Sequence, residues 1–379
     1  RISIMGNGVT KEMVILREIP FAVGDTLLMN DTAEMALKAE QNLVNTSLFH
    51  FASVSFGDSG HVQINVTERW YIWPMPFFNI EERNFNVWLR DMSLEKVTYG
   101  LYVYHENFRG RKEYLKLLPK TGYNQIYGLS YSKPYIDKKQ NWGISAALGF
   151  EASHSMSYTV IDHEPRTLKL SDEYVYSGLF TSVATTRRVG MYQLHKISLM
   201  YESTSFADSL FRLNPDYAPT QSWSRFTLNY QYRYDFRDVK NYPLKGWYAD
   251  AELNLGGISG LSENSDPEFY LKSTSRKYFN ITGPLYFATG ATFYVGLTRG
   301  ETFATSGFMG YGNDFVRGYQ YRVIPVRHYL IHRNNVKYNL LPQRILKLPF
   351  IRTNKFNRAP VSVFVNAFFD QGWSQRGNF

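Results

Sequence analysis

The chain has 379 residues, a formal net charge of +9 and no cysteine, so disulfides, thiol catalysis and cysteine-based metal sites are excluded. It contains no run of about 18 apolar residues, which excludes helical membrane spans. Aromatic residues make up 17% of the chain, a share typical of proteins whose rings lie at a membrane interface. Residues 1–70 carry a net charge of −3 and residues 71–379 carry +12. We expect no nucleic-acid partner for the basic part, because its cations lie on alternating strands rather than in one compact patch.

Residues 1–70 predict a small soluble domain with the element order β-α-α-β-β. Thr10 is placed to cap a short first helix, and Asp31 with Glu34 forms a variant capping box that would begin a second helix. Two strands are predicted at about 49–56 and 61–68. The domain boundary is therefore expected between residues 70 and 71.

From residue 71 onward the pattern changes to long strands with a period of two residues. Between Arg225 and Arg237, every even position is aromatic or leucine and every odd position is polar. A soluble sandwich would also alternate, but thirteen such residues match a tilted membrane strand with one lipid face and one wet face. We therefore predict that residues 71–379 form a transmembrane antiparallel β-barrel. The predicted strands lie near 76–84, 96–105, 112–119, 124–134, 141–152, 171–184, 191–204, 225–237, 247–255, 267–280, 285–297, 328–341 and 361–370.

The strand count predicts that the barrel extends beyond the printed chain. Thirteen strands are an odd number, whereas single-chain bacterial barrels have even numbers. No closing strand with an aromatic end follows the last predicted strand before Phe379. We expect about 16 strands in the complete barrel, with the C-terminal ones missing from this chain.

Two short motifs combine a charged residue with glycine and aromatic residues. Residues 314–319 read Asp-Phe-Val-Arg-Gly-Tyr in a glycine-rich region between two strands, and residues 368–373 read Phe-Phe-Asp-Gln-Gly-Trp. An arginine inside a barrel needs an acidic partner, since a buried charge without one is costly and a charge-assisted pair fixes geometry. The residues of interest are Val316, Arg317, Gly318 and Tyr319 in the first motif, with Asp370 and Gly372 in the second.

Two further motifs occur earlier in the chain, and all four together resemble a known family. Tyr131 to Tyr135 reads Tyr-Ser-Lys-Pro-Tyr at a strand end. A strand-turn-strand motif contains Asp235, Arg237, Asp238, Pro243 and Gly246. In this order, the four motifs resemble those of the BamA/TamA-type outer-membrane assembly factors, and residues 1–70 resemble their POTRA domain. The resemblance covers essentially the whole chain and implies that Arg317, on a loop folded into the barrel, docks on the inner wall near Asp370.

Prolines mark the start of the first barrel strand. A proline cannot donate a hydrogen bond to a neighbouring strand and is confined to edges and strand starts. One reading is that the prolines stiffen the linker from the first domain. The other is that they weaken the seam where this strand meets the last one, so that the barrel opens sideways and offers an edge to an incoming strand. The residues concerned are Trp73, Pro74, Pro76, Phe77 and Phe78.

The sequence predicts no enzyme. It contains no His-Glu-x-x-His, nucleophile elbow, Walker loop or dinucleotide fingerprint, and its eight histidines are scattered. We therefore expect no catalytic residue, no metal site and no cofactor.

The resemblance implies an insertase in the outer membrane of a Gram-negative bacterium, with the POTRA-like domain in the periplasm. Its expected partners are unfolded outer-membrane β-barrel precursors, outer-membrane lipids including lipopolysaccharide, and accessory lipoproteins or surface-exposed subunits. One alternative is a transporter of the two-partner-secretion type that exports a dedicated passenger. Another is a passive pore.

Overall fold

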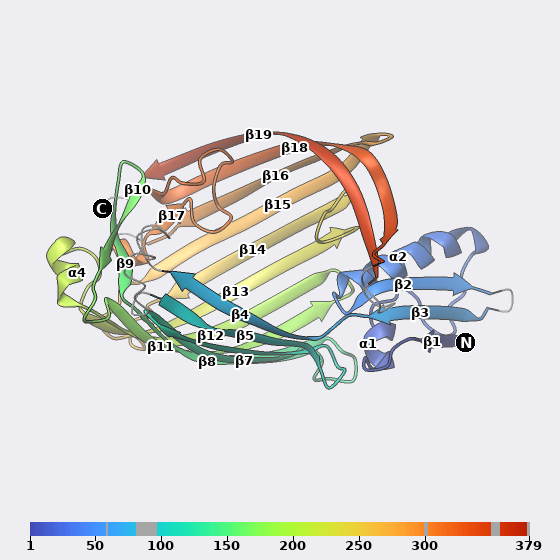
Figure 1. Cartoon of the computed structure of the whole chain (residues 1–379), viewed down its shortest axis with the longest axis horizontal. Helices are drawn as coiled ribbons and strands as arrows, with labels where there is room; N and C mark the ends of the chain where they lie inside the picture. Colours follow the sequence, from blue (N-terminus) through green and yellow to red (C-terminus); the bar gives the residue numbers. More distant parts are fainter. Residues whose placement is uncertain (58–59, 81–96, 299–301, 350–356, 377–379) are drawn as a thin grey trace.

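The computed structural model describes residues 1–57, 60–80, 97–298, 302–349 and 357–376. It shows a small N-terminal unit at one end of a large curled sheet, whose long strands run from that unit to the opposite end (Figure 1). Among the described residues, no helix is both long and apolar enough to cross a membrane.

The N-terminal unit (residues 1–68) contains β1 (Ile2–Met5), α1 (Glu12–Leu16), α2 (Thr32–Asn45), β2 (Phe49–Phe56) and β3 (Val62–Glu68). This is the predicted element order. The sheet order is β1-β3-β2, with β1 parallel and β2 antiparallel to β3. Burial of the apolar faces of both helices and the sheet forms the core of the unit. Its fully buried members include Val14, Ile15, Leu43 and Ile64.

The two predicted helix caps are wrong. Within the described part of the chain, neither α1 nor α2 has a side-chain hydrogen bond at its N-cap. The hydroxyl of Thr10 instead contacts the hydroxyl of Tyr71 at 3.0 Å and accepts from the amide of Asn107 at 2.9 Å. Tertiary contacts thus take the oxygen that local capping would have used, and Thr10 ties the N-terminal unit to the large sheet.

The large sheet has fourteen strands. Each long strand pairs antiparallel with the next long strand in the chain, through connections that range from short turns to loops with elements of their own. The thirteen predicted strands all correspond to long strands of this sheet, with bounds that shift by several residues. The strands are β4 (Ile72–Ile80), β5 (Val97–Phe108), β6 (Glu113–Gly122), β7 (Asn124–Lys133), β8 (Trp142–Ser153), β11 (Tyr176–Val189), β12 (Gln193–Phe206), β13 (Ser222–Arg237), β14 (Gly246–Gly256), β15 (Glu268–Thr282), β16 (Leu285–Gly296), the short β17 (Gly307–Met309), β18 (Ile324–Lys347) and β19 (Arg358–Arg376).

The sheet is not closed by hydrogen bonds within the described residues, so the structure shows a large antiparallel sheet and not a complete barrel. There, β4 pairs with β5 alone and β19 pairs with β18 alone, so both are edge strands. A strand with one neighbour leaves every second N–H and C=O group without a ladder partner. The first strand was predicted at 76–84 but spans Ile72–Ile80, and 81–84 lie outside the described residues. It begins before both prolines because an edge strand tolerates them.

The two faces of the strands differ as the alternation predicts. On β13, Arg225 and Asn229 point to the inner face, where they contact carboxylates of Glu202 and Glu252. On the outer face of β8 and β11, large apolar side chains such as Leu148 and Val183 are exposed. An outer apolar surface and an inner polar one match a sheet that faces lipid on one side.

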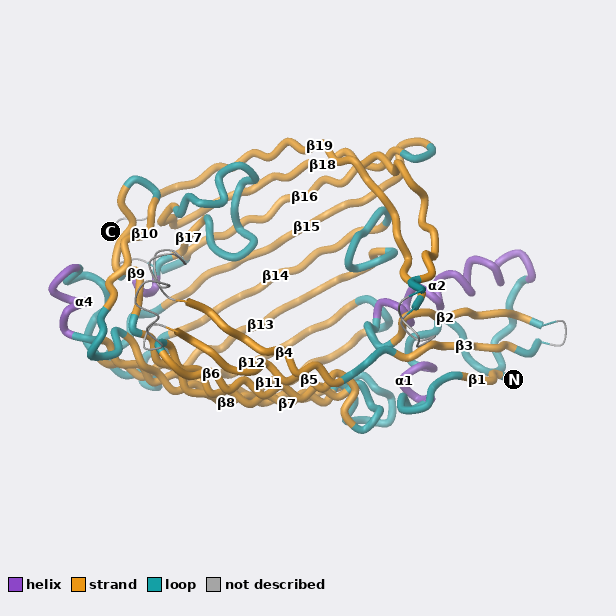
Figure 2. Tube along the Cα trace, in the orientation of Figure 1, coloured by secondary structure: helices purple, strands orange, loops and turns teal. Residues whose placement is uncertain are grey.

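A cap of shorter elements lies at the end opposite the N-terminal unit (Figure 2). It consists of the hairpin β9 (Ser155–Ile161) and β10 (Glu164–Lys169), the helix α4 (Asp208–Leu213) and a 3-10 turn at Phe303–Thr305. Buried apolar residues join these pieces. They include Val175, Phe206, Leu210, Tyr217 and Phe303.

Candidate functional site

The loop between β17 and β18 is fixed to the inner wall by Arg317. Its Nε donates to Oδ2 of Asp370 at 2.7 Å, and its terminal nitrogen donates to Oδ1 at 2.5 Å. The backbone N–H of Arg317 adds a third bond to the same carboxylate at 3.1 Å. The guanidinium also lies 4.1 Å from the ring centroid of Phe368 and donates to the carbonyl of Asn334. With an Asp370 side chain only 1% exposed, this bidentate pair fixes both position and orientation of the loop.

The rest of the motif packs closely around this pair. A Cβ at Gly372 would lie 2.6 Å from Cγ2 of Val316, so the wall needs a glycine where the loop valine rests. Gly318 has φ +94°, a left-handed conformation that suits glycine and turns the loop back. Tyr319 is exposed. Asp314 forms a second ion pair with Lys272 at 2.5 Å, which holds the other end of the loop to β15.

The free edge of β4 has fewer hydrogen-bond donors than an ordinary strand. The N–H of Glu106 on β5 donates to the carbonyl of Tyr71 at 2.9 Å, and Ile72 opposes His105. Odd-numbered residues of β4 therefore bond to β5, and even-numbered ones point their backbone groups to the edge. Since Pro74 and Pro76 are even-numbered and lack N–H groups, two donors are missing at that edge.

The side chains of β4 divide between the two faces of the sheet. Trp73 and Phe77 point inward, and the ring centroid of Phe77 lies 3.9 Å from Nζ of Lys120. Phe78 points outward and is 61% exposed. The first strand therefore carries aromatic rings on both its faces.

The strand-turn-strand motif forms the connection between β13 and β14. Arg237 makes a bidentate pair with Asp235, with distances of 2.7 and 2.8 Å. Asp238 accepts from the N–H groups of Val239 and Leu244 and so closes the turn that contains Pro243. Gly246 has φ +99°, and a Cβ there would lie 2.0 Å from the carbonyl oxygen of Phe236. These residues keep the turn in one conformation.

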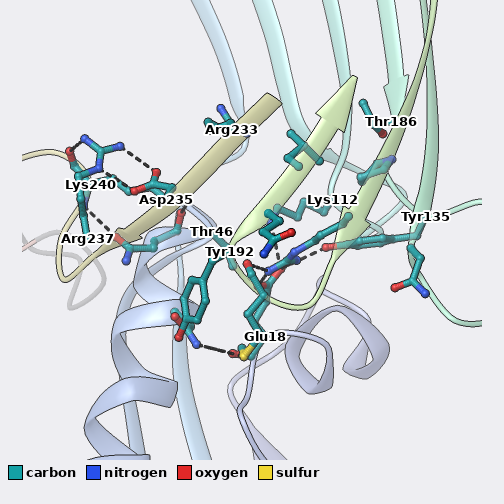
Figure 3. Close-up of a pocket in the computed structure, with 18 residues that line it drawn as sticks. Glu18, Thr46, Lys112, Tyr135, Thr186, Tyr192, Arg233, Asp235, Arg237 and Lys240 are labelled. Carbon is teal, nitrogen blue, oxygen red and sulfur yellow. Dashed lines mark hydrogen bonds and ion pairs between the residues drawn. The ribbon is translucent and has the colours of Figure 1, made fainter. Parts of the chain in front are cut away.

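Glu18 connects the N-terminal unit to the ends of three different strands or turns (Figure 3). Its carboxylate accepts from Arg188 at 2.7 and 2.6 Å, from Lys112 at 3.2 Å and from the hydroxyl of Tyr135 at 3.2 Å. The Glu18 side chain is only 5% exposed. Burial alone would raise its pKa, but the charge of Lys112 and the hydrogen bonds and charge of Arg188 outweigh burial, so the pKa of Glu18 lies well below its usual range.

Neighbouring contacts extend this docking interface. The N–H of Lys11 donates to the carbonyl of Gly110 at 2.8 Å, and Arg17 donates to the carbonyl of Gly190 at 2.8 Å. Asn45, the last residue of α2, contacts the β13–β14 turn at Asp238 and Lys240. The N-terminal unit is thus held at the ends of β5–β6, β7–β8, β11–β12 and β13–β14.

A polar cavity of about 250 Å³ lies at this interface (Figure 3). Both the N-terminal unit and the large sheet contribute to its lining, which includes Glu18, Asn45, Arg188, Arg233 and Asp235. The cavity therefore marks the place where the N-terminal unit covers one mouth of the curled sheet. Within the described ranges, no three histidines or carboxylates gather in a way that could hold a metal ion.

Several of these residues were not predicted from the sequence. Lys112 and Arg188 lie 94 and 170 residues from Glu18, and no local pattern links them. Tyr135 was noted only as part of a strand-end motif, which gave no indication of its carboxylate partner. Asn45 carries no sequence signal for its contact with the turn.

Comparisons with known proteins agree with this architecture. Residues 107–378 match the model of the Omp85 superfamily domain. Among solved structures, the chain is similar to BamA from Haemophilus ducreyi lacking POTRA domains 1–3, at 16% identity and a TM-score of 0.49, covering 98% of this chain and 71% of that one. It is also similar to CdiB from Escherichia coli, at 10% identity and a TM-score of 0.50, covering 98% and 69%. CdiB from Acinetobacter baumannii matches at 12% identity and a TM-score of 0.49, covering 99% and 63%. No curated protein sequence matches the chain.

The matched region covers well over half of the chain. The chain therefore belongs to the Omp85 superfamily, which confirms the family expected from its motifs. Omp85 proteins are outer-membrane proteins of the insertase or transporter kind, and this chain is accordingly one of them.

Proposed function

We propose that this protein is an insertase that folds and inserts β-barrel precursors into the outer membrane of a Gram-negative bacterium. The observation that carries the proposal is the free edge of β4, where Pro74 and Pro76 remove two donors. An incoming strand can still donate to the remaining carbonyl groups of this edge, which is β-augmentation. A pairing with fewer hydrogen bonds is also easier to release, so the finished barrel can leave.

The N-terminal unit supports the proposal as a POTRA-like domain in the periplasm. Its order β1-α1-α2-β2-β3 is that expected from the resemblance, and it docks at one mouth of the sheet. We infer that it receives unfolded precursors there. Outer-membrane lipids, lipopolysaccharide and accessory lipoproteins or surface-exposed subunits are the other partners that we propose.

The role we propose for Arg317 is conformational. Its pair with Asp370 holds the inner loop on the inner face of β19. Removing one partner of a buried ion pair costs about 3–5 kcal/mol, enough to release the loop. No chemical step, nucleotide or metal is part of this mechanism.

The experiment uses the protein in liposomes and follows the folding of a urea-denatured outer-membrane barrel by its gel shift. We expect accelerated folding relative to empty liposomes, and we expect Arg317→Ala to abolish the acceleration. Arg322→Ala is the matched control, because Arg322 lies in the same loop with an exposed side chain. This control should fold precursors at the rate of the unmodified protein.

The same vesicles distinguish the other functions of the superfamily. A dedicated exporter or a passive pore would conduct ions without accelerating the folding of an added barrel. That result would overturn the insertase proposal. Acceleration that survives Arg317→Ala would keep the insertase but contradict the role of the inner loop.

A further inference from the structure

The β13–β14 turn (residues 238–245) contacts parts of the molecule that are not its neighbours in the sheet. In the sheet, β15 and β16 separate β14 from β18, and β19 lies beyond β18. Nevertheless the turn contacts the N-terminal unit on one side and both β18 and β19 on the other. We propose that this turn is a mechanical link that couples docking of the N-terminal unit to the position of β19.

The first end of the link is Asn45 at the end of α2. Its Nδ2 donates to the carbonyl of Asp238 at 2.8 Å, and its Oδ1 accepts from the N–H of Lys240 at 3.1 Å. The Lys240 ammonium also donates to the Asn45 carbonyl at 3.3 Å. The side-chain amide of Asn45 therefore acts as both donor and acceptor to backbone groups of the turn. Two hydrogen bonds fix the orientation of the turn relative to α2 as well as its distance from α2.

The turn itself is stiff enough to transmit a displacement. The N–H of Asp238 donates to the carbonyl of Lys245 at 3.1 Å, and the Asp238 carboxylate accepts two further backbone N–H groups inside the turn. Arg237 donates to the carbonyl of Lys240 at 3.3 Å while it is paired with Asp235. Pro243 adds a fixed backbone angle.

The second end of the link rests on the inner face of β18 and β19. The ammonium of Lys337 donates to the carbonyl of Pro243 at 3.0 Å and lies 4.0 Å from the ring centroid of Tyr242. Lys337 is only 6% exposed, so both of its contacts are shielded from water. This shielding strengthens them. On β19, the Tyr242 hydroxyl donates to Oδ1 of Asn366 at 3.1 Å and its ring packs 4.9 Å from that of Phe364. Lys337 and Asn366 are direct partners in the ladder, so the turn holds both strands at one register position.

This contact matters because the inner face of β19 is held at two places. The inner loop holds it through Asp370, and the turn holds it four residues earlier through Asn366. Such contacts contribute to the local stability of the strand, which hydrogen exchange reports. Undocking of the N-terminal unit would withdraw the turn and loosen β19 at that position.

The test is amide hydrogen exchange of residues 364–368 in the full chain in lipid nanodiscs, without any substrate. We expect Tyr242→Ala and Asn45→Ala both to accelerate this exchange, by roughly fivefold for the loss of one to two hydrogen bonds. Asn45 lies on the N-terminal unit, so an effect at β19 requires transmission through the turn. Lys337→Met serves as a second variant if Tyr242→Ala does not fold.

Gln41→Ala is the matched control. Gln41 carries the same type of side-chain amide on α2, four residues before Asn45, and lies outside the lining of the interface cavity. Exchange in β19 should remain unchanged in this variant. The proposal is overturned if Asn45→Ala leaves β19 exchange unchanged, or if Gln41→Ala accelerates it equally. Because no substrate is present, either outcome is independent of the insertase proposal.

Discussion

Because Gly372 has no side chain, the inner loop can pack against β19 at this position. A Cβ at this position would lie 2.6 Å from Cγ2 of Val316, and valine cannot swing aside freely because its χ1 is restricted. We predict that Gly372→Ala lifts the loop and costs about 1–3 kcal/mol, as overpacking usually does. Trypsin cleavage of the loop after Arg317 should then become faster than in the unmodified protein.

The double variant Val316→Ala with Gly372→Ala provides the control. It removes the methyl groups that the new Cβ would meet, so it should restore resistance to trypsin, and the coupling of the two changes can be measured as a cycle. Unchanged cleavage in Gly372→Ala alone would mean that the loop does not depend on this close contact.

Contacts between individual residues could be predicted from the sequence only where both residues belong to a recognisable motif. Arg317 and Asp370 belong to two recognisable motifs, and the structure brings their side chains into contact. Glu18 has no such signal, because its partners are distant in sequence and lie in turns of ordinary composition. Long-range pairs of charged residues require the fold before they can be identified.

At the scale of elements, the number of backbone N–H donors on the free side of β4 should control how tightly an incoming strand pairs with it. Replacing Pro74 and Pro76 by valine restores two N–H donors on the free side of β4, where each hydrogen bond contributes about 1 kcal/mol. We predict that the double variant holds an incoming strand more tightly along this edge and releases it more slowly, which slows the assisted folding of an added barrel. Folding is measured by the gel shift, as for Arg317→Ala.

Met75→Val is the control for this prediction. The N–H of residue 75 points toward β5, so a change there leaves the donors of the free edge unaltered. If the proline variant and this control assist folding equally, the missing donors have no part in function.

Strand positions followed from the sequence because side chains that face lipid and water alternate strictly. The period-two pattern of β13 gave its position within a few residues. The hairpin β9–β10 and the helix α4 were not predicted, since they pack against one another in an apolar cluster instead of lining a two-faced wall. The strand β9 does alternate, because Met156, Tyr158 and Val160 face this cluster, but its seven residues are fewer than in the long strands on which the prediction depended.

At the scale of the whole molecule, alternation could not predict whether the described sheet closes. Alternation identifies each strand but is identical for a closed and an open sheet, because both have one lipid face and one wet face. Whether β4 and β19 pair is decided by backbone hydrogen bonds, to which the sequence contributes little beyond proline. Within the described residues, the structure has no ladder between these two strands.

Docking of the N-terminal unit should depend on pH through Glu18. Its folded-state pKa is depressed below the ordinary value of 4.5, so its contribution to docking is fully present above about pH 4.5 and is lost progressively as the pH falls below it. Since the chain has no cysteine, nitroxide labels at Ser55→Cys and Val183→Cys report the distance between the two parts without background. We expect one narrow distance distribution at pH 7 that broadens in acid.

Glu18→Gln should give the broad distribution at pH 7 as well, because Arg188 and Lys112 then lose their counter-charge at a cost of about 3–5 kcal/mol. Glu12→Gln on α1 removes an equal charge from an exposed position and should leave docking intact. A narrow distribution for Glu18→Gln would mean that the backbone contacts at Gly110 and Gly190 hold the unit by themselves. A broad one would show that this carboxylate holds the N-terminal unit to the strand ends at Lys112, Tyr135 and Arg188.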